Sequence, residues 1–221
     1  EVMKDRMKRV TRQVTNCIEI SRRYLKLLGP NSHEPGKVWV NNILLDLGDL
    51  VRALPDARGH ELQISPLTPD VMLNVNGTDL IQILLNITIN ALQSTRECHL
   101  VEVRSEFHTA PIDFSEISDA PNQRVININA VQNVSPMLGL SVIDNGPGMG
   151  SDVLERIFEP FVSQSSAERR AGLGLCIVKR LLKENRCGLH VHSEPGRGSM
   201  FTLFLPARAP MPKNQGPVRP H

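Results

Sequence analysis

The stretch that decides the fold reads VIDNGPGMG and runs from Val142 to Gly150. A run rich in β-branched residues leads into an acid, Asp144, and a loop containing Gly146 and Gly148 follows directly. A carboxylate at the end of a buried strand needs a hydrogen-bond donor, because burying it unpaired costs free energy. An adenine amino group is a suitable donor, and the glycines let the backbone approach a flat ligand closely. Asp-Asn-Gly-Pro is also ordinary turn sequence, so this stretch alone leaves both interpretations open.

Two asparagines precede this stretch on a helix that we expect from Asp79 to about Thr95. Asn86 and Asn90, in LLNITINALQS, are four residues apart and therefore share one helical face. Their amide oxygens could hold a magnesium ion or a phosphate-bound water. Asparagines that bond neighbouring backbone would give the same pattern, and the residues alone do not separate the two interpretations.

A glycine-rich helix start follows the central stretch. The segment 171–181 reads AGLGLCIVKRL and comes after a polar run, 163–170. Free N–H groups and the positive end of the helix dipole favour phosphate binding at such a start. The polar run is compatible with a mobile lid in which Arg169 or Arg170 meets phosphate oxygens, and also with an ordinary solvated loop.

The order of the remaining elements predicts an α/β sandwich, with a mixed sheet and helices layered on one face. We expect a helix capped by Asn41 or Asn42, a helix over 79–95, a short helix from 152 and a helix over 174–185. We expect strands over 61–65, 100–107, 124–131, 138–143, 189–193 and 200–205. The interval 108–123 has the composition of a surface insertion.

The chain divides into four parts. Residues 1–28 carry apolar or small residues in alternating steps of four and three, which is typical of a helix that packs lengthwise against partner helices. Residues 29–37 are predicted to be a linker and 38–206 the folded domain. Residues 207–221 are rich in proline and are expected to form a disordered tail.

Composition excludes several classes of protein. The 221 residues include 25 Lys+Arg and 23 Asp+Glu, a net charge of +2 that does not indicate a nucleic-acid binder. The four cysteines form no CxxC pair, which argues against a zinc site and favours a reducing compartment. No apolar stretch approaches the roughly 20 residues that cross a bilayer, so the chain is expected to be soluble. It begins at Glu1, as a fragment of a longer protein would.

Taken in order, the motifs resemble those of the catalytic ATP-binding domain of sensor histidine kinases, a superfamily that includes gyrase, Hsp90 and MutL. NITINA is similar to its N box, DNGPGM to its G1 box, IFEPF to its F box and GLGL to its G2 box. EPGRGSMFTLFLP resembles the last glycine-rich turn and strand of the family. The resemblance covers about residues 37–206. It implies a Bergerat fold that binds ATP and Mg²⁺ between a mixed sheet and helices, under a flexible lid.

The resemblance also implies roles for single residues. Asn90 would coordinate Mg²⁺, Asn86 would support the phosphates or the metal, and Asp144 would bond the adenine amino group. Phe158 and Phe161 would anchor the base of the lid. The nucleotide-contacting set that we expect is Asn86, Asn90, Gln93, Asp144, Gly146, Gly148, Met149, Phe158, Arg169, Arg170, Gly172, Leu173, Gly174 and Leu175.

A histidine kinase is the function that the resemblance implies, with the γ-phosphate passed to a histidine and then to a response-regulator aspartate. His33 is followed by Glu34, as the acceptor of the family is, but Pro35 and Gly36 forbid a continuing helix, so we expect the acceptor to lie outside this chain. Asn86 stands where gyrase and Hsp90 carry a water-activating glutamate, which disfavours ATP hydrolysis as the main reaction.

Three partners follow from the same resemblance. They are ATP, a second copy of the chain joined through residues 1–28 and a missing first helix, and a receiver domain. We expect no nucleic acid, a cytoplasmic location, and contact with a membrane only through upstream regions absent from this chain. The alternative from another class is a degenerate adaptor module of the same fold, which binds nucleotide weakly or binds a protein, without kinase activity.

Overall fold

The computed structural model describes residues 36–115, 117–160 and 174–208, which all fall in one compact unit. The predicted bundle helix, residues 1–28, lies outside the described residues, as do the polar run 163–170 and the chain beyond Arg208. Those predictions therefore stay predictions.

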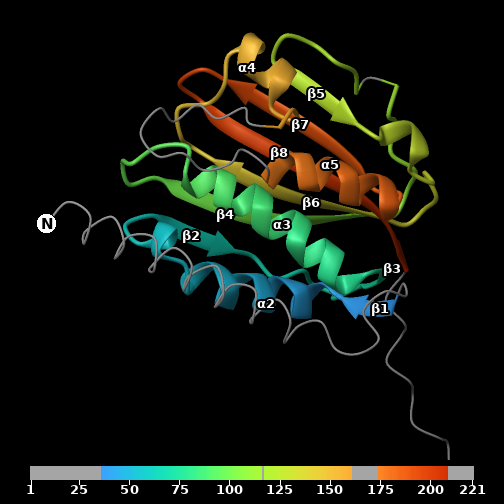
Figure 1. The fold of residues 1–221 in the computed structure, drawn as a ribbon. Helices are drawn as coiled ribbons and strands as arrows, with labels where there is room; N and C mark the ends of the chain where they lie inside the picture. The colour runs from blue at the N-terminus through green and yellow to red at the C-terminus, as the bar shows by residue number, and fades with distance from the viewer. Residues whose placement is uncertain (1–35, 116, 161–173, 209–221) are drawn as a thin grey trace, which may run out of the picture. The chain divides into compact units, whose positions relative to one another are not determined.

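Three long helices cover one face of the sheet (Figure 1). They are α2 (Val40–Arg52), α3 (Gly77–Leu92) and α5 (Gly174–Glu184). Each one buries an apolar stripe; on α5 this consists of Leu175, Val178, Leu181 and Leu182. Helix α3 begins where the Asn76 side chain accepts hydrogen bonds from the backbone N–H groups of Thr78 and Asp79. A shorter helix, α4 (Ser151–Arg156), follows the central stretch of the sequence.

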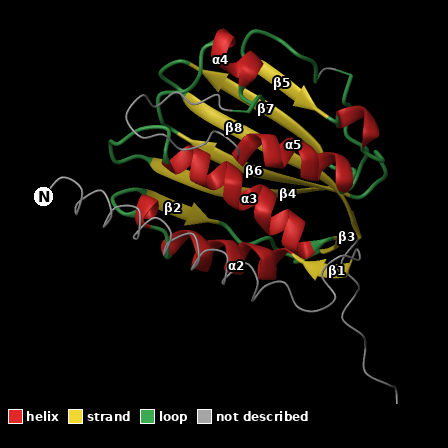
Figure 2. Ribbon diagram, viewed as in Figure 1, coloured by secondary structure: helices red, strands yellow, loops and turns green. Residues whose placement is uncertain are grey.

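The strands form one mixed sheet of eight members (Figure 2). They are β1 (Gly36–Trp39), β2 (Glu61–Ile64), β3 (Met72–Val75), β4 (Leu100–His108), β5 (Gln123–Ile126), β6 (Met137–Asp144), β7 (Gly188–Glu194) and β8 (Gly198–Arg208). The main path runs β1-β3-β8-β6-β4-β2, and β7 joins β5 to β8. Only β2 and β4 are paired in parallel among the described strands. The predicted α/β sandwich with a mixed sheet is confirmed.

The side chains that face the helices alternate along each central strand. On β6, Leu140 and Val142 are each 1% exposed and Asp144 is 4% exposed, whereas Ser141 and Ile143 between them are half-buried. The acid at position 144 therefore lies on the same face as the apolar core, beside α3.

The beginning of the domain differs from the prediction. Helix α2 begins at Val40 after Trp39, and no side chain caps it. Asn41 does not act as a cap: its amide bonds the backbone of Leu67 in both directions, at 2.8 and 3.0 Å. Strand β1 begins inside the predicted linker and pairs with β3, a strand that the sequence did not indicate.

The predicted surface insertion packs on the sheet instead of lying free on it. Ile112, Phe114 and Ile117 contact a buried cluster formed by Ile128, Val131, Met137 and Phe204. The rings of Phe114 and Phe204 meet edge to face, with centroids 5.2 Å apart. The strand expected over 124–131 ends earlier, at Ile126, because a turn of 3₁₀ helix, Ile128–Ala130, follows it.

The last strand is longer than predicted. Strand β8 continues to Arg208, and its Ala207 pairs with Leu73 of β3. The first two residues of the predicted tail therefore belong to the sheet.

Candidate functional site

Asp144 ends strand β6 on the helix-covered face. Its Oδ1 accepts the backbone N–H of Gly146 at 2.9 Å. Burial raises the pKa of the Asp144 carboxyl, and the bond from Gly146, the charge of His99 and bonds from Ser199 act in the opposite direction. A nearly buried carboxylate that carries this penalty gains free energy from an additional donor, which is what an adenine amino group would provide.

Gly146 leaves no room for a side chain. A Cβ atom there would lie 2.5 Å from Ser94 Oγ and 2.8 Å from Asp144 Oδ1. Ser94 lies just beyond the end of α3, so the helix end and the Asp144 loop meet at this glycine. Residue 146 therefore keeps the loop close to both polar groups.

Gly148 packs against the turn between β7 and β8. Its φ is +65°, and a Cβ atom there would lie 1.9 Å from the backbone oxygen of Glu194. At Gly198, a Cβ atom would lie 1.9 Å from the backbone oxygen of Asp144. These glycines bring the loop into contact with the turn between β7 and β8, so the close approach is between two backbones.

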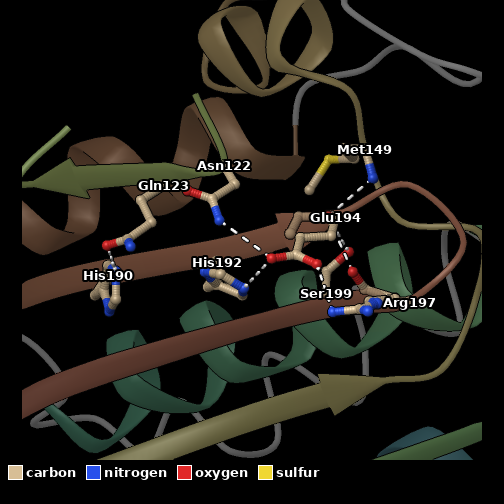
Figure 3. Close-up of polar contacts among 10 residues, drawn as sticks. Asn122, Gln123, Met149, His190, His192, Glu194, Arg197 and Ser199 are labelled. Carbon is tan, nitrogen blue, oxygen red and sulfur yellow. Dashed lines mark hydrogen bonds and ion pairs between the residues drawn. The ribbon is translucent and has the colours of Figure 1, made fainter. Parts of the chain in front are cut away.

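Polar side chains at the end of β7 contact the loop and the turn that follows β7 (Figure 3). Ser193 Oγ accepts the N–H of Met149 at 2.8 Å and donates to the backbone oxygen of Gly198 at 3.1 Å. On the other side of the strand, Glu194 is approached by Asn122, His192 and Arg197. The backbone of Met149 is thus fixed from β7, a role that its place in the expected set did not reveal.

The polar stripe of α3 faces the start of α5. Asn86 Nδ2 donates to the backbone oxygen of Gln82, and its Oδ1 lies 3.4 Å from the position of a Cβ at Gly174. Asn90, one turn further on, is exposed, and Gln93 is the half-buried C-cap residue of the helix. Of the two asparagines predicted for metal and phosphate, Asn86 therefore lies next to α5, and Asn90 is exposed one turn further along α3.

Two more members of the expected set are buried supports. Phe158 is 7% exposed and Leu175 is 8% exposed, so both pack inside the domain. Phe161, Arg169, Arg170, Gly172 and Leu173 lie outside the described residues. Gly174 is the first described residue of α5.

The residues present fit Mg·ATP. The carboxylate of Asp144 lacks full compensation for its burial, and Gly174 keeps the start of α5 close to the Asn86 amide oxygen. Magnesium prefers oxygen ligands and keeps several waters, so one exposed asparagine and phosphate oxygens suit it. Within the described ranges, no group of three or more His, Cys, Asp or Glu residues could hold a metal ion by itself.

The sequence missed three residues near the site: Ser94, His99 and Ser193. Ser193 could have been found, because it follows Leu189 and Val191 in the buried phase of β7, where a serine needs polar partners. His99 and Ser94 carry no pattern, because His99 contacts backbone oxygens and Ser94 lies against Gly146, which is distant in the sequence. None of the described helices combines the length and apolar character needed to cross a bilayer.

Comparisons with known sequences show the family to which the chain belongs. The sequence profile of the family "Histidine kinase-, DNA gyrase B-, and HSP90-like ATPase" matches residues 75–209. The sensory histidine kinase/phosphatase NtrB of Rhodobacter capsulatus is 30% identical over 148 residues, which cover 66% of this chain and 37% of NtrB. The sensor histidine kinase ZraS of Escherichia coli is 26% identical over 163 residues, 73% of this chain and 29% of ZraS. The chain thus spans roughly a third of each of these relatives.

Solved structures share the fold. Full-length ShkA in complex with AMPPNP is 27% identical with a TM-score of 0.56, over 88% of this chain and 36% of ShkA. The catalytic domain of the histidine kinase ThkA, in a nucleotide-free form, has a TM-score of 0.57 at 18% identity, over 78% of this chain and 95% of that domain. The chain therefore belongs to the histidine kinase-, DNA gyrase B- and HSP90-like ATPase family, in which it corresponds to the ATP-binding catalytic region of sensor histidine kinases.

Proposed function

We propose that this domain binds Mg·ATP and presents the γ-phosphate to a histidine outside this chain, as the catalytic part of a sensor histidine kinase. The observation that carries the proposal is the Asp144 carboxylate, which is 4% exposed and whose pKa is raised by burial. It forms one end of the proposed site, and the close approach of Asn86 to Gly174 forms the other. An acceptor for an adenine amino group and a polar edge for phosphates thus belong to one domain.

Each end of the site has its own task. Asp144 and the loop at Gly146 recognise and orient the base. Asn86 and the start of α5 receive the phosphates, and Asn90 holds the magnesium ion, which when bound neutralises charge on the β- and γ-phosphates. Gln93, with Arg169 or Arg170, would contact the phosphates at the same end.

Transfer to an acceptor is favoured over hydrolysis. Asn86 donates through Nδ2 to the backbone oxygen of Gln82, and an amide cannot take a proton from water at neutral pH. The site therefore positions the γ-phosphate without activating a water molecule against it. This supports a kinase over an ATPase with its own turnover.

The partners of the whole protein are part of the proposal. The basic heptad segment 1–28 supplies one helix of a bundle through which two copies pair, together with a helix that precedes it. The relatives carry the names of sensor histidine kinases, which supports a receiver domain of a response regulator as the next phosphoryl acceptor. We place the domain in the cytoplasm, where ATP is available.

Titration with Mg·ATP tests the proposal. We expect the melting temperature of the chain to rise with the logarithm of the Mg·ATP concentration, with roughly millimolar ATP sufficient for a clear shift. Asp144→Ala and Asn90→Ala should each remove the shift. Asn42→Ala, on the exposed side of α2, is the matched control and should keep it. Phosphate release in the absence of an acceptor should stay near background.

Two outcomes would decide against the proposal. If Mg·ATP gave the unaltered chain no shift, the adaptor function would take its place. If Asp144→Ala still responded as the unaltered chain does, the base would bind elsewhere.

A further inference from the structure

His99 is a nearly buried histidine directly before strand β4, and it is 8% exposed. The pairing of β4 with β6 continues one step past the strands: Leu100 N–H donates to Asn145 Oδ1 at 2.8 Å, and Asn145 N–H donates to the Leu100 backbone oxygen at 3.2 Å. The segment that carries His99 is therefore tied to the residue directly after Asp144.

The register places His99 beside Asp144 on the sheet. Val101 pairs with Asp144, and the next step along, at Leu100 and Asn145, is the one just described. Residues two apart on a strand share a face, so His99 shares the face of Val101 and lies diagonal to Asp144. Side chains in that relation are within reach of each other.

Both ring nitrogens of His99 lie within hydrogen-bond distance of backbone oxygens. Its Nδ1 lies 3.1 Å from the backbone oxygen of Glu97, and its Nε2 lies 3.0 Å from the backbone oxygen of Ala91. A backbone oxygen only accepts hydrogen bonds, and a neutral imidazole has only one N–H to give. The imidazolium satisfies both contacts, whereas the neutral ring leaves a nitrogen lone pair against an oxygen.

Two titratable groups face His99. The His60 ring, from the segment before β2, meets it edge to face at a centroid distance of 4.4 Å. The second is the Asp144 carboxylate, from β6. A positive charge on His99 lowers the pKa of Asp144, which opposes the effect of burial. Ser94 Oγ, 3.5 Å from the His99 Nε2, stands between the ring and the loop at Gly146.

We propose that His99 is a positioning residue for base recognition, whose imidazolium keeps the Asp144 carboxylate in the anionic form that accepts the adenine amino group. A protonated Asp144 would offer an O–H where the base also offers an N–H, and the two donors would repel. The inference rests on the proposed function, because it assigns His99 a task at the same base site.

Binding of Mg·ATP at different pH values tests the inference. In the unaltered chain, Asp144 should accept the base down to the pH at which its carboxyl protonates. We call the fall of Mg·ATP affinity on acidification the acid limb of binding. His99→Gln removes the charge and keeps one amide donor, so this acid limb should move to higher pH, by about half a unit or more. At about pH 8, where the carboxyl is ionised in both proteins, the affinities should agree within about twofold.

The matched control is His190→Gln. His190 pairs in register with Thr202, whose hydroxyl contacts Ser141, so it belongs to the sheet face opposite to Asp144. Its Nε2 is 2.9 Å from Gln123 Oε1. The acid limb of this variant should match that of the unaltered chain. His99→Phe keeps a ring without a charge and replaces His99→Gln if the glutamine variant does not fold.

Calorimetry of Mg·ATP binding between about pH 5 and pH 8, with a ¹³C NMR titration of the Asp144 carboxyl, gives the answer. The inference predicts that the carboxyl titrates at higher pH in His99→Gln, together with the acid limb. An unchanged acid limb, or an equal loss of affinity at every pH, would overturn it and leave the proposed function intact. No binding by the unaltered chain at any pH would instead overturn the proposed function.

Discussion

Ser193 and Met149 are joined by a hydrogen bond across 44 residues of sequence, with the Met149 N–H donating to Ser193 Oγ at 2.8 Å. Ser193 is 1% exposed, and its hydroxyl also donates to the backbone oxygen of Gly198. The loop that follows Asp144 is therefore held by a side chain of β7 as well as by its own turn.

Removing that hydroxyl should loosen the loop. We expect Ser193→Ala to lower the free energy of unfolding by about 1–3 kcal/mol, because a buried N–H and a buried backbone oxygen lose their partner. The affinity for Mg·ATP should fall as well, because we propose that this loop orients the base. Denaturant unfolding and calorimetry measure the two effects.

Ser141→Ala is the control for Ser193→Ala. Ser141 bonds Thr202 at 2.9 Å on the opposite, half-buried face of the sheet. We expect a loss of less than about 1 kcal/mol and no change in affinity. Equal effects of the two substitutions on affinity would contradict the role given to Ser193.

Asp144→Asn should separate stability from binding. Burial raises the pKa of Asp144 above its ordinary value of 3.8, so the folded state holds its proton to higher pH than the unfolded chain does. The contribution of Asp144 to stability therefore falls as pH rises from 3.8 through the raised value. Asparagine carries no such cost, so the variant should gain on the unaltered chain in free energy of unfolding over this range.

The same variant should lose Mg·ATP affinity by about tenfold or more. A carboxylate has two accepting oxygens, one for the Gly146 N–H and one for the base, whereas an amide has a single oxygen and turns its NH2 group toward one of these donors. Thermal unfolding at several pH values and calorimetry are the measurements. A variant that is less stable at neutral pH than the unaltered chain would show that the carboxylate is better compensated than we infer.

Gly148→Ala should be far more costly than Gly196→Ala. Both glycines have a positive φ, +65° and +77°, which an alanine adopts at a cost of about 1 kcal/mol. Only at Gly148 would the new methyl group also meet backbone, 1.9 Å from the Glu194 oxygen, whereas nothing lies within 4 Å at Gly196. We expect an additional loss of about 2 kcal/mol or more in denaturant unfolding for Gly148→Ala. Similar losses at both sites would mean that the two turns do not press together.

Phe114→Ala should lower stability without affecting the site. The Phe114 ring packs on Phe204, and its loss should cost about 1–3 kcal/mol of unfolding free energy. Leu45→Ala, on α2 at 68% exposure, is the control and should cost less than about 0.5 kcal/mol. Mg·ATP affinity should be unchanged in both. If Phe114→Ala had no effect on unfolding, the segment 108–123 would be the loose insertion that its composition predicts.

The sequence predicted the centre of the fold well, because its signals are local. Strand β6 ends at Asp144 as VIDNGPGMG indicates, and α3 carries Asn86 and Asn90 on one edge. In both cases a hydrophobic period of two or of 3.6 residues is interrupted by polar residues that a core would not contain.

What the sequence could not predict depends on distant partners or on contacts with backbone atoms. Strands β1 and β3 are four residues each and are recognisable mainly through their pairing with each other, from Gly36 with Val75 to Trp39 with Met72. Asn41 is a residue type that often caps helices, but its side-chain amide instead makes two hydrogen bonds with the backbone of Leu67, 26 residues away. The His99 ring is positioned by two backbone oxygens, and a pattern of side chains in the sequence does not reveal such contacts.

The close approach of Gly198 to Asp144 has a consequence for how the protein is made. The ribosome releases residue 144 long before residue 198, so the loop after Asp144 can meet Ser94 and Leu100 early but meets the turn between β7 and β8 only after that turn has been synthesised. The loop after Asp144, where we propose that the base binds, is therefore completed by the last strand of the domain. A growing chain reaches that arrangement only at the end of translation of this domain.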